Sequence, residues 1–555
     1  MSVTEAAANP AKAERRGKVL EVLRELLAEG RTEEAIALVA KLVARNAELE
    51  RLLAEARSKG KKSEGVSSEQ LKLVLDGLPA NSNADLAEVN ARLRRASGVE
   101  EEKTSKDEPA RGRARKPRSR RPIPTVLRRV ENVIPVPAEE RPCPTCGAER
   151  VCIGHDVTEI IDLIPAEVVV RLDKREKLAC GPCEGEVVRA PLGDKVVPGG
   201  KMGTALVAQV LVDKYRDGLP LNRQVERFER LGLEVPISTL ADQVTWATDA
   251  MRPLWHAARE KVLGSTVMHL DATGLPVLDA DAPGGIRQGG VWGYVGSDVS
   301  DGDAQHTALC LYTSTGKRHG QRDGELGPAE MLERRIGLTV ADASGLFDEA
   351  FKRKDLIECG CNMHSRRYFI KALEAGDTRA ALPVAAFKKL YDIEVELKLA
   401  PIEERRHQRQ SRSKPIYDDL LAWAKAYRPH EPPSSGLGRA IQYLLNHQMA
   451  LRRFLDDGVI PIDNGIVERL HIRTALTRKN FLFAGSDAGG ERAAIAFTLL
   501  GCCALAKVDP VKYLADVLPR LATRKLRLCD MPALLPEAWK RAQGTVGGTV
   551  SAPGR

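Results

Sequence analysis

Apolar and polar residues alternate with different periods in different parts of the chain, and the first period is that of a helix. Between Thr32 and Ala56, apolar residues recur at alternating spacings of four and three, the register of a coiled coil. Asn46 falls on this apolar seam, where a buried amide can fix the alignment and number of paired helices. The segment predicts a helix that either self-associates or packs on its own domain.

A second stretch of helical periodicity begins near residue 200. Apolar spacing predicts one helix over Lys201–Tyr215 and two short helices over Leu219–Leu231 and Pro236–Trp246, with Gly232 in the turn between them. Two short helices joined by a glycine turn are typical of a helix-turn-helix, whose second helix enters the DNA major groove. Helix hairpins also occur in helical proteins that bind no DNA, so the pattern alone leaves both interpretations open.

Short apolar runs rich in Val and Thr follow, and these have the length of strands. They predict five strands, with one helix (Pro328–Ile336) before the fourth: Thr266–Leu270, Gly290–Gly296, Thr307–Thr313, Leu338–Ala341 and Leu356–Cys361. Three consecutive strands, a helix and another strand form the element order of the ribonuclease-H-like fold. Residues 380–457, rich in Leu, Ala, Lys and Arg, predict a wholly helical insertion after these strands.

Composition places these elements in several domains. A chain of 555 residues is too long for one core, and its 43% hydrophobic content is enough for globular packing. The N-terminus lacks the apolar segment of a secretory signal, and the longest apolar stretch, Ala493–Ala506, is shorter than a membrane span. We therefore expect a soluble cytoplasmic protein of multidomain α+β class with no membrane partner.

Four cysteines form the strongest local motif. Cys143 and Cys146 make one C-x2-C pair, and Cys180 and Cys183 make another. Each pair presents two thiolates to one ion at the spacing that tetrahedral Zn²⁺ requires, and four protein ligands indicate a structural site. A redox dithiol is the alternative, and the eleven cysteines of a chain without an export signal favour metal ligation over disulfides.

Positive charge is concentrated in one short segment. The net charge is only +9, yet seven of the eleven residues in Arg111–Arg121 are Lys or Arg, and prolines interrupt the segment. Such a run is either a solubilising tether or an arm that binds nucleic-acid phosphates. As phosphate contacts we predict Arg113, Arg115, Lys116, Arg118, Arg120 and Arg121.

Three widely spaced carboxylates suggest a metal-dependent nuclease site. Asp271 and Asp342 each end an apolar run of strand length, whereas Glu468 lies in a predicted helix. Carboxylates from two strand ends and one helix can converge on a pair of hard cations such as Mg²⁺ or Mn²⁺, which act on phosphodiesters. Taken singly, each acid is also explained as a solvated turn or surface residue.

Basic residues accompany these acids. Arg469 and Arg473 are one helical turn apart and point away from Glu468, so that they can bind flanking phosphates or form surface ion pairs. Cys359 and Cys361 with His364 also have metal-ligand spacing, but the sequence offers no clear fourth ligand. The predicted DNA contacts near the acids are Arg366, Arg367, Arg469, Arg473, Arg478 and Lys479.

Several longer segments carry a resemblance to a known family. They include Lys214–Gln224, Asp342–Gly345, Asp463–Arg469, Arg478–Arg492 and Asp509–Leu514, in the order given. With the cysteine pairs, they resemble the DDE transposases of the insertion-sequence-sixty-six family over residues 46–521. The resemblance implies that Asp271, Asp342 and Glu468 are the catalytic acids and that the four paired cysteines bind zinc.

The resemblance also implies a function and a set of partners. A bacterial transposase binds the terminal inverted repeats of its element and target DNA at the nucleoid, uses two Mg²⁺ or Mn²⁺ ions, and works as a homo-oligomer beside accessory proteins. Two alternatives remain: a catalytically inactive DNA-binding regulator, and a structure-specific nuclease without strand transfer.

The segments predict eight regions along the chain. An N-terminal helical region is followed by a helical segment with the basic linker, a zinc-binding domain, a helix-turn-helix domain, the first part of the core, the insertion, the second part of the core and a C-terminal segment. Their boundaries are 1–60, 61–125, 126–198, 199–260, 261–375, 376–457, 458–505 and 506–555.

Overall fold

The structure is a computed structural model of the chain. Besides a few isolated positions before residue 200, it describes residues 83–98, 167–178, 188–190, 200–301, 303–316, 325–342, 345–523 and 525–546. The chain divides into two units, residues 102–171 and the remainder. All described residues except 167–171 belong to the larger unit. The predicted coiled coil, the paired cysteines and the basic segment lie outside the described residues, except for isolated positions.

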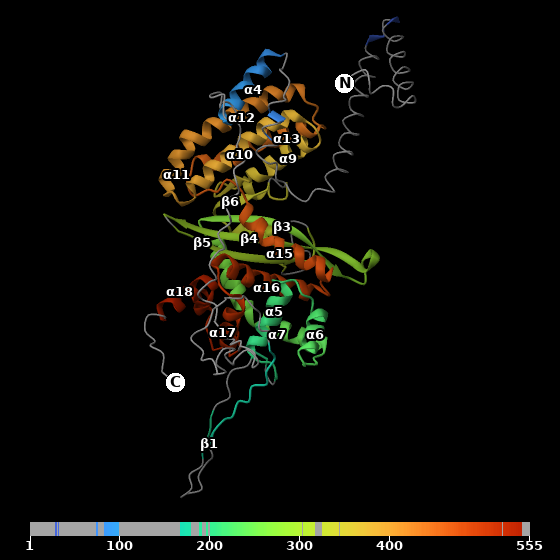
Figure 1. Ribbon diagram of the computed structural model, residues 1–555, viewed down its shortest axis with the longest axis vertical. Coiled ribbons are helices and arrows are strands. Elements are labelled where there is room, and N and C mark those ends of the chain that lie inside the picture. The colour runs from blue at the N-terminus through green and yellow to red at the C-terminus, as the bar shows by residue number, and fades with distance from the viewer. Residues whose placement is uncertain are drawn as a thin grey trace, which may run out of the picture. The chain divides into compact units, whose positions relative to one another are not determined.

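A five-stranded mixed sheet lies between two groups of helices (Figure 1). Its spatial order is β5-β4-β3-β6-β7, in which β3, β4 and β5 are antiparallel neighbours and β6 and β7 run parallel to β3. Helix α8 (Pro328–Arg334) precedes β6, as predicted. The strands are β3 (Val267–Leu278), β4 (Ile286–Ser300), β5 (Asp303–Thr313), β6 (Gly337–Ala341) and β7 (Leu356–Gly360).

Strand β3 is longer than the sequence predicts. Its parallel pairing with β6 ends at His269 opposite Val340, but its antiparallel pairing with β4 continues to Leu278. The prediction that Asp271 ends a strand is therefore wrong, because Asp271 lies inside β3 at the point where β6 leaves the sheet. Asp342 directly follows the last residue of β6, as expected.

Two helices from the C-terminal part of the chain cover the sheet. Helix α15 (Gly465–Phe481) lies against β3 and β4, and α16 (Asp487–Ala506) lies against β5. The Oγ1 atom of Thr498 accepts a hydrogen bond of 2.8 Å from the backbone N–H of Cys310, which fixes α16 on β5. Gly501 allows close packing here, since a Cβ at this position would lie 2.7 Å from Leu470 of α15.

Helix α16 is the most apolar long helix in the described part of the chain. Its N-terminal cap is Ser486, whose Oγ accepts the backbone N–H of Gly489. Within the part of the chain that the structure describes, it is the one helix long and apolar enough to cross a membrane, and 61% of its most apolar window is buried inside the fold. Its contacts with β5 and α7 account for that apolar character as core packing.

Three helices precede the sheet: α5 (Thr204–Tyr215), α6 (Leu221–Arg230) and α7 (Ile237–Leu263). An ion pair between Asp213 and Arg227 joins α5 to α6. The prediction of a second short helix after Gly232 is wrong, because α7 has 27 residues. Its C-terminal half continues to the sheet, where the Trp255 indole donates to the carbonyl of Cys310 at 2.9 Å.

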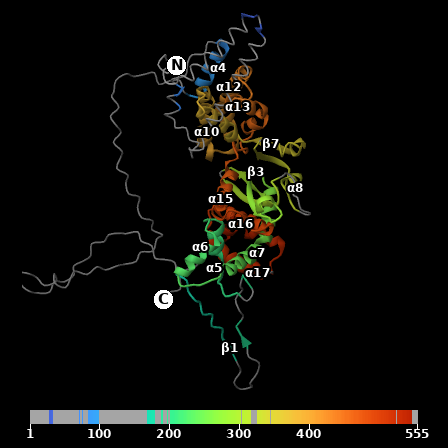
Figure 2. The same cartoon turned by 90° about the vertical axis from the view of Figure 1, so that its right-hand side faces the viewer.

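The segment between β7 and α15 is helical, as predicted. Buried polar contacts fasten its core: Arg409 is 1% exposed, pairs with Glu394 at 2.7 Å and donates to three backbone carbonyls. Figures 1 and 2 show this group on one side of the sheet together with α4 (Ala84–Ala96). Its main helices are α9 (Asn362–Glu374), α10 (Ala381–Glu396), α11 (Ile402–Gln408), α12 (Lys414–Tyr427), α13 (Gly436–Asn446) and α14 (Gln448–Arg452).

The remaining described elements are small or C-terminal. Strands β1 (Lys177–Leu178) and β2 (Val188–Arg189) form an antiparallel pair. Helix α17 (Pro510–Ala522) packs on α5, and α18 (Pro536–Val546) packs on α16.

Candidate active site

Asp271 and Asp342 are brought together by the register of two parallel strands. His269 of β3 is paired with Val340 of β6, and each aspartate lies two residues further along its chain in the same direction. Because neighbouring strands lie about 4.8 Å apart, this register places the two carboxylates side by side at the edge where β6 ends. The sheet itself therefore assembles two of the three predicted acids.

The environment of this pair disfavours its negative charge. Burial raises the pKa of Asp271, against the effects of the Ala272 backbone N–H and the nearby positive charges of His364 and Arg367. Burial also raises the pKa of Asp342, and the negative charge of Asp271 raises it further. A divalent cation between the two carboxylates would offset both lost hydration and mutual repulsion.

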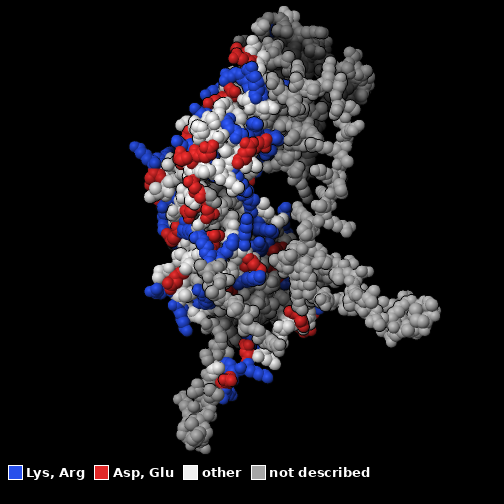
Figure 3. Space-filling view, turned by 60° about the vertical axis from the view of Figure 1, so that its left-hand side comes forward, with Lys and Arg blue, Asp and Glu red and all other residues white. Residues whose placement is uncertain are grey.

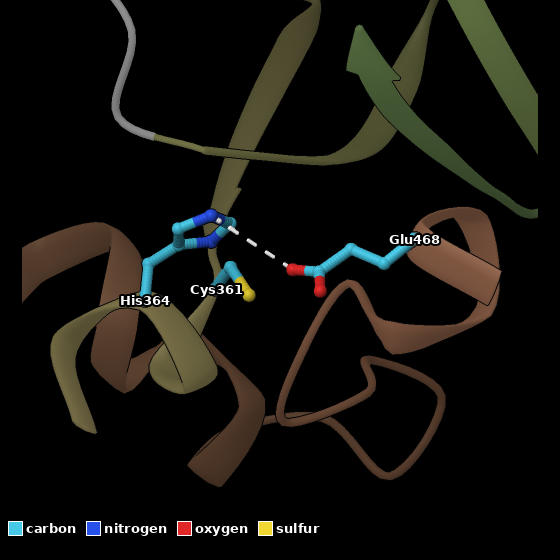
Figure 4. Close-up of side chains that lie close together, drawn as sticks. All are labelled: Cys361, His364 and Glu468. Carbon is cyan, nitrogen blue, oxygen red and sulfur yellow. Dashed lines mark ion pairs between the residues drawn. The ribbon is translucent and has the colours of Figure 1, made fainter. Parts of the chain in front are cut away.

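Glu468 joins this region from the first turn of α15. Its Oε1 lies 3.8 Å from Nε2 of His364, and its Oε2 lies 3.4 Å from Nη2 of Arg367 (Figure 4 shows the side chains of His364 and Glu468). His364 acts electrostatically on both aspartates as well, so one histidine links all three acids. Glu468 and Asp271 therefore share two neighbours on α9, His364 and Arg367, which places the third predicted acid in the same region as the aspartate pair.

The position of α15 on the sheet depends on contacts on both sides of Asp271. The buried Asn464 donates to the Leu270 carbonyl at 2.7 Å, and its Oδ1 lies 3.0 Å from Nδ1 of His269. Burial lowers the pKa of His269 to about 4, so this ring is neutral near pH 7 and donates through Nδ1. One turn after Glu468, Nε2 of His471 lies 3.1 Å from the carbonyl oxygen of Asp271.

A glycine makes room for this contact. Gly293 of β4 is paired with Asp271, and a Cβ at position 293 would lie 2.6 Å from Nε2 of His471. A Cβ there would force the His471 ring to move, and with it the contact to the Asp271 carbonyl. The close approach of helix and strand is therefore built into the sequence of β4.

The sequence did not identify these docking residues. Asn464 lies within a segment that carries the family resemblance and His471 lies just after it, but nothing in their spacing indicates a bond to a strand about 200 residues earlier. His269 is one polar residue in an apolar run, and this context does not indicate its hydrogen-bond partner. Only the pairing of α15 with β3 reveals their part in placing Glu468.

The predicted DNA-contacting residues on α9 and α15 divide into engaged and exposed groups. Arg367 pairs with Glu468, and Arg478 donates to the Gly274 carbonyl and to Oγ1 of Thr273, so both have partners inside the protein. Arg473 is exposed and donates to the Arg216 carbonyl at 3.3 Å. The others comprise the exposed Arg469 and Lys479 and the half-buried Arg366.

The donor set fits a hard divalent cation. The aspartates lie side by side on neighbouring strands, and Oε1 of the nearby Glu468 is buried without a hydrogen-bond partner among the described residues. Carboxylate oxygens are the ligands that Mg²⁺ and Mn²⁺ prefer, and an unsatisfied buried oxygen is stabilised by a cation. The zinc-ligand predictions at Cys143, Cys146, Cys180 and Cys183 and the basic-segment predictions concern residues outside the described ranges.

Comparison with known proteins gives the family. Residues 199–492 match the family described as "Transposase IS66 family", and residues 140–184 match the "zinc-finger binding domain of transposase IS66", which supports the predicted structural zinc. Relatives occur in Sinorhizobium fredii (strain NBRC 101917 / NGR234). Uncharacterized protein y4hP is 33% identical over 522 residues, covering 90% of this chain and 89% of the relative, and y4qI is 30% identical over 489 residues, covering 86% of each. The first family match spans more than half of the chain, and the chain belongs to the IS66 transposase family.

Proposed function

We propose that this protein cleaves the DNA ends of its own insertion element and joins them to target DNA, with Asp271, Asp342 and Glu468 as the catalytic acids. Two observations support the proposal: strand register pairs the aspartates, and hydrogen bonds from Asn464 and His471 hold the helix that bears Glu468 against the same part of β3. The strand order β5-β4-β3-β6-β7 supports a ribonuclease-H-like core, in which acids gather at this edge.

The proposed chemistry follows from the donor set. The three acids would hold a pair of Mg²⁺ or Mn²⁺ ions, which supply Lewis acidity and an activated oxygen nucleophile when bound. Water attacks the phosphodiester at the element's end and leaves a 3′-hydroxyl, which then attacks a target strand in a second displacement. Asp271 and Asp342 keep a fixed spacing because they belong to adjacent strands. His364 and Arg367 limit the repulsion among the three carboxylates while DNA is absent.

The DNA would be held by surfaces around this site. In Figure 3, Lys and Arg side chains gather across the middle of one face of the described part. The zinc-finger domain, the basic segment Arg111–Arg121, and the α6–α7 pair acting as a helix-turn-helix would recognise the terminal repeats. Hydrogen bonds from Arg473 to Arg216 and from Asn480 to Gly218 join α15 to the end of α5 and the turn before α6.

The active assembly is proposed to be a homo-oligomer on the nucleoid, assisted by other proteins of the same element. Two DNA ends must be cut and joined together, which needs at least two copies of the active site or one site used repeatedly. The predicted coiled coil at residues 32–56 supplies a self-association helix for this purpose.

Purified full-length protein, oligonucleotides bearing the element's terminal repeats, and Mg²⁺ test the proposal. Nicked ends and joined products are expected, and scrambled repeats should yield neither. Specific binding without any cleavage would instead support the inactive regulator. Cleavage that ignores the repeats and produces no joined strands would support a simple nuclease.

A further inference from the structure

A second group of ligand atoms overlaps the candidate active site. Cys361 follows β7 and caps the N-terminus of α9, His364 lies in the first turn of α9, and Glu468 approaches from α15 (Figure 4). One ligand atom from each residue lies within 4.8 Å of the other two. Sulfur, imidazole nitrogen and carboxylate oxygen together form a softer donor set than the three carboxylates.

We propose that Cys361, His364 and Glu468 form a binding site for Zn²⁺, or a similar borderline transition metal, that competes with the catalytic cations for Glu468. Thiolate and imidazole ligands select Zn²⁺ over Mg²⁺, which prefers oxygen. The site has three protein ligands and an open fourth position for water. It is separate from the paired cysteines of the zinc-finger domain.

The geometry is close to that of a zinc site. Ligand atoms at ordinary Zn–S and Zn–N or Zn–O distances in a tetrahedron are separated by roughly 3.3–3.5 Å. His364 Nε2 and Glu468 Oε1 are already 3.8 Å apart, so side-chain movements of a few tenths of an ångström bring these two atoms to the tetrahedral separation. The third ligand atom, within 4.8 Å of both, needs at most a further shift of about 1.5 Å.

The surroundings of the ligands prepare them for a metal. The Cys361 side chain is fully buried, which raises the pKa of its thiol, so a bound metal must displace the proton; the sulfur accepts the backbone N–H of Asn464 at 3.2 Å, which fixes its position. Oε1 of Glu468 is buried without a hydrogen-bond partner in the described ranges. The side chains of His364 and Glu468 keep 22% and 23% exposure, which leaves a route for a cation from solvent.

Occupation of this site would have a regulatory effect. Zinc bound by Cys361, His364 and Glu468 would hold the Glu468 carboxylate beside α9 and weaken its binding to cations beside Asp271, so we expect bound zinc to inhibit Mg²⁺-dependent cleavage. This consequence rests on the proposed function, whereas metal binding does not. Since the two metals share one ligand, raising the Mg²⁺ concentration should relieve the inhibition competitively.

Metal binding is tested first, on full-length protein whose zinc-finger domain is already filled with Zn²⁺. Added Co²⁺ should occupy one further site and give a thiolate-to-cobalt charge-transfer absorption band. Cys361→Ser should remove that band, and His364→Gln should weaken binding at least tenfold. The matched control is Cys529→Ser, which changes an exposed cysteine on the protein surface and should leave the band intact. Thermal unfolding shows whether each variant is folded.

The binding result has clear opposing outcomes. Absence of a further Co²⁺ site in the wild type, or a band that persists in folded Cys361→Ser protein, would overturn the proposal. Serine can still accept the Asn464 N–H, so this variant is expected to fold. His364→Gln provides a second test at a partly exposed position.

Inhibition is tested by comparing cleavage with and without micromolar Zn²⁺ within each variant. Wild type and Cys529→Ser should lose most cleavage in Zn²⁺. In Cys361→Ser, the ratio of cleavage with Zn²⁺ to cleavage without it should approach one. If wild type never cleaves, the proposed function fails while the Co²⁺ result still decides the metal site. If it cleaves and Zn²⁺ has no effect, the regulatory inference alone fails.

Discussion

Asp271 and Asp342 differ from Glu468 in the forces that position them. The aspartates lie on neighbouring strands, and backbone hydrogen bonds of the sheet set their spacing. Glu468 lies on a helix that reaches the sheet after the helical insertion, and side chains such as Asn464 and His471 set its position. A single substitution rarely changes the register of a sheet, but it can move a docked helix. The position of Glu468 should therefore be more sensitive to substitution than the spacing of the two aspartates.

Removal of a catalytic acid should give the largest effect. Asp271→Asn and Glu468→Gln should each lower cleavage and joining by roughly a thousandfold or more, since groups acting as a unit cannot replace each other. DNA affinity, measured by fluorescence anisotropy, should stay within about twofold of wild type. Residual cleavage above about a tenth of wild type in either variant would remove that residue from the acid triad.

Asn464→Ala should disturb the position of Glu468 while leaving the two aspartates in place. It leaves the buried His269 Nδ1 and the Leu270 carbonyl without this partner, which costs about 2–4 kcal/mol of unfolding free energy. Cleavage should fall strongly while the strand register persists, as amide hydrogen exchange of β3 and β6 can show. Asn480→Ala is the matched control on the same helix, because Asn480 is exposed and makes one bond to Gly218. Equal losses of activity in both variants would contradict the special position of Asn464.

Gly293→Ala tests the packing of the same helix from the side of the sheet. Its new Cβ would meet the His471 ring at 2.6 Å and the Val467 side chain at 3.3 Å, so these side chains, or α15 with them, must shift, at a cost of about 1–3 kcal/mol. Urea denaturation measures the loss. Gly203→Ala is the control, since no atom lies within 4 Å of a Cβ at that position. An unchanged denaturation midpoint for Gly293→Ala would mean that α15 is not seated against β4 as described.

The raised pKa values of Asp271 and Asp342 give a pH dependence with a defined sign. The native state binds these protons more tightly than the unfolded state, so their contribution is most favourable below the ordinary carboxyl pKa of about 4 and is lost as pH rises through the folded values. Without added divalent cation, wild type should lose stability relative to Asp271→Asn as pH rises. Saturating Mg²⁺ should reverse the difference. A wild type that gains stability over the variant without Mg²⁺ would contradict the assigned direction.

Exposed arginines on α15 should give the smallest effect. Arg469→Ala and Arg473→Ala should each reduce the slope of log affinity against log salt by about one if each contacts a phosphate. Cleavage at saturating DNA should change little. A slope equal to wild type in both variants would restrict these residues to protein contacts.

The sequence predicted the strands better than their ends. Val- and Thr-rich runs identified all five strands of the sheet, but Gly274 and Pro276 concealed the extension of β3, which continues because β4 remains beside it. Pro253 and scattered polar residues concealed the full length of α7 in the same way. Local patterns record which residues suit a strand or helix, whereas neighbours in the fold decide where each one ends.

The sequence proposed three candidate acids, but not the contacts around them. Residue type and strand or helix context selected Asp271, Asp342 and Glu468, and their catalytic role stays a prediction. The partnership of Asn464 with His269 spans 195 residues, and no periodicity within either segment reveals it. The link of Cys361 and His364 with Glu468 likewise exists only after α9 and α15 are packed together.

Anomalous scattering from Mn²⁺ in crystals of the full-length protein with terminal-repeat DNA would test the shared-cation site most directly. We predict manganese peaks bound by Asp271 and Asp342, with the Glu468 carboxylate turned from Arg367 to join the same ions. Manganese bound elsewhere, or held by the aspartates while Glu468 still pairs with His364 and Arg367, would contradict it.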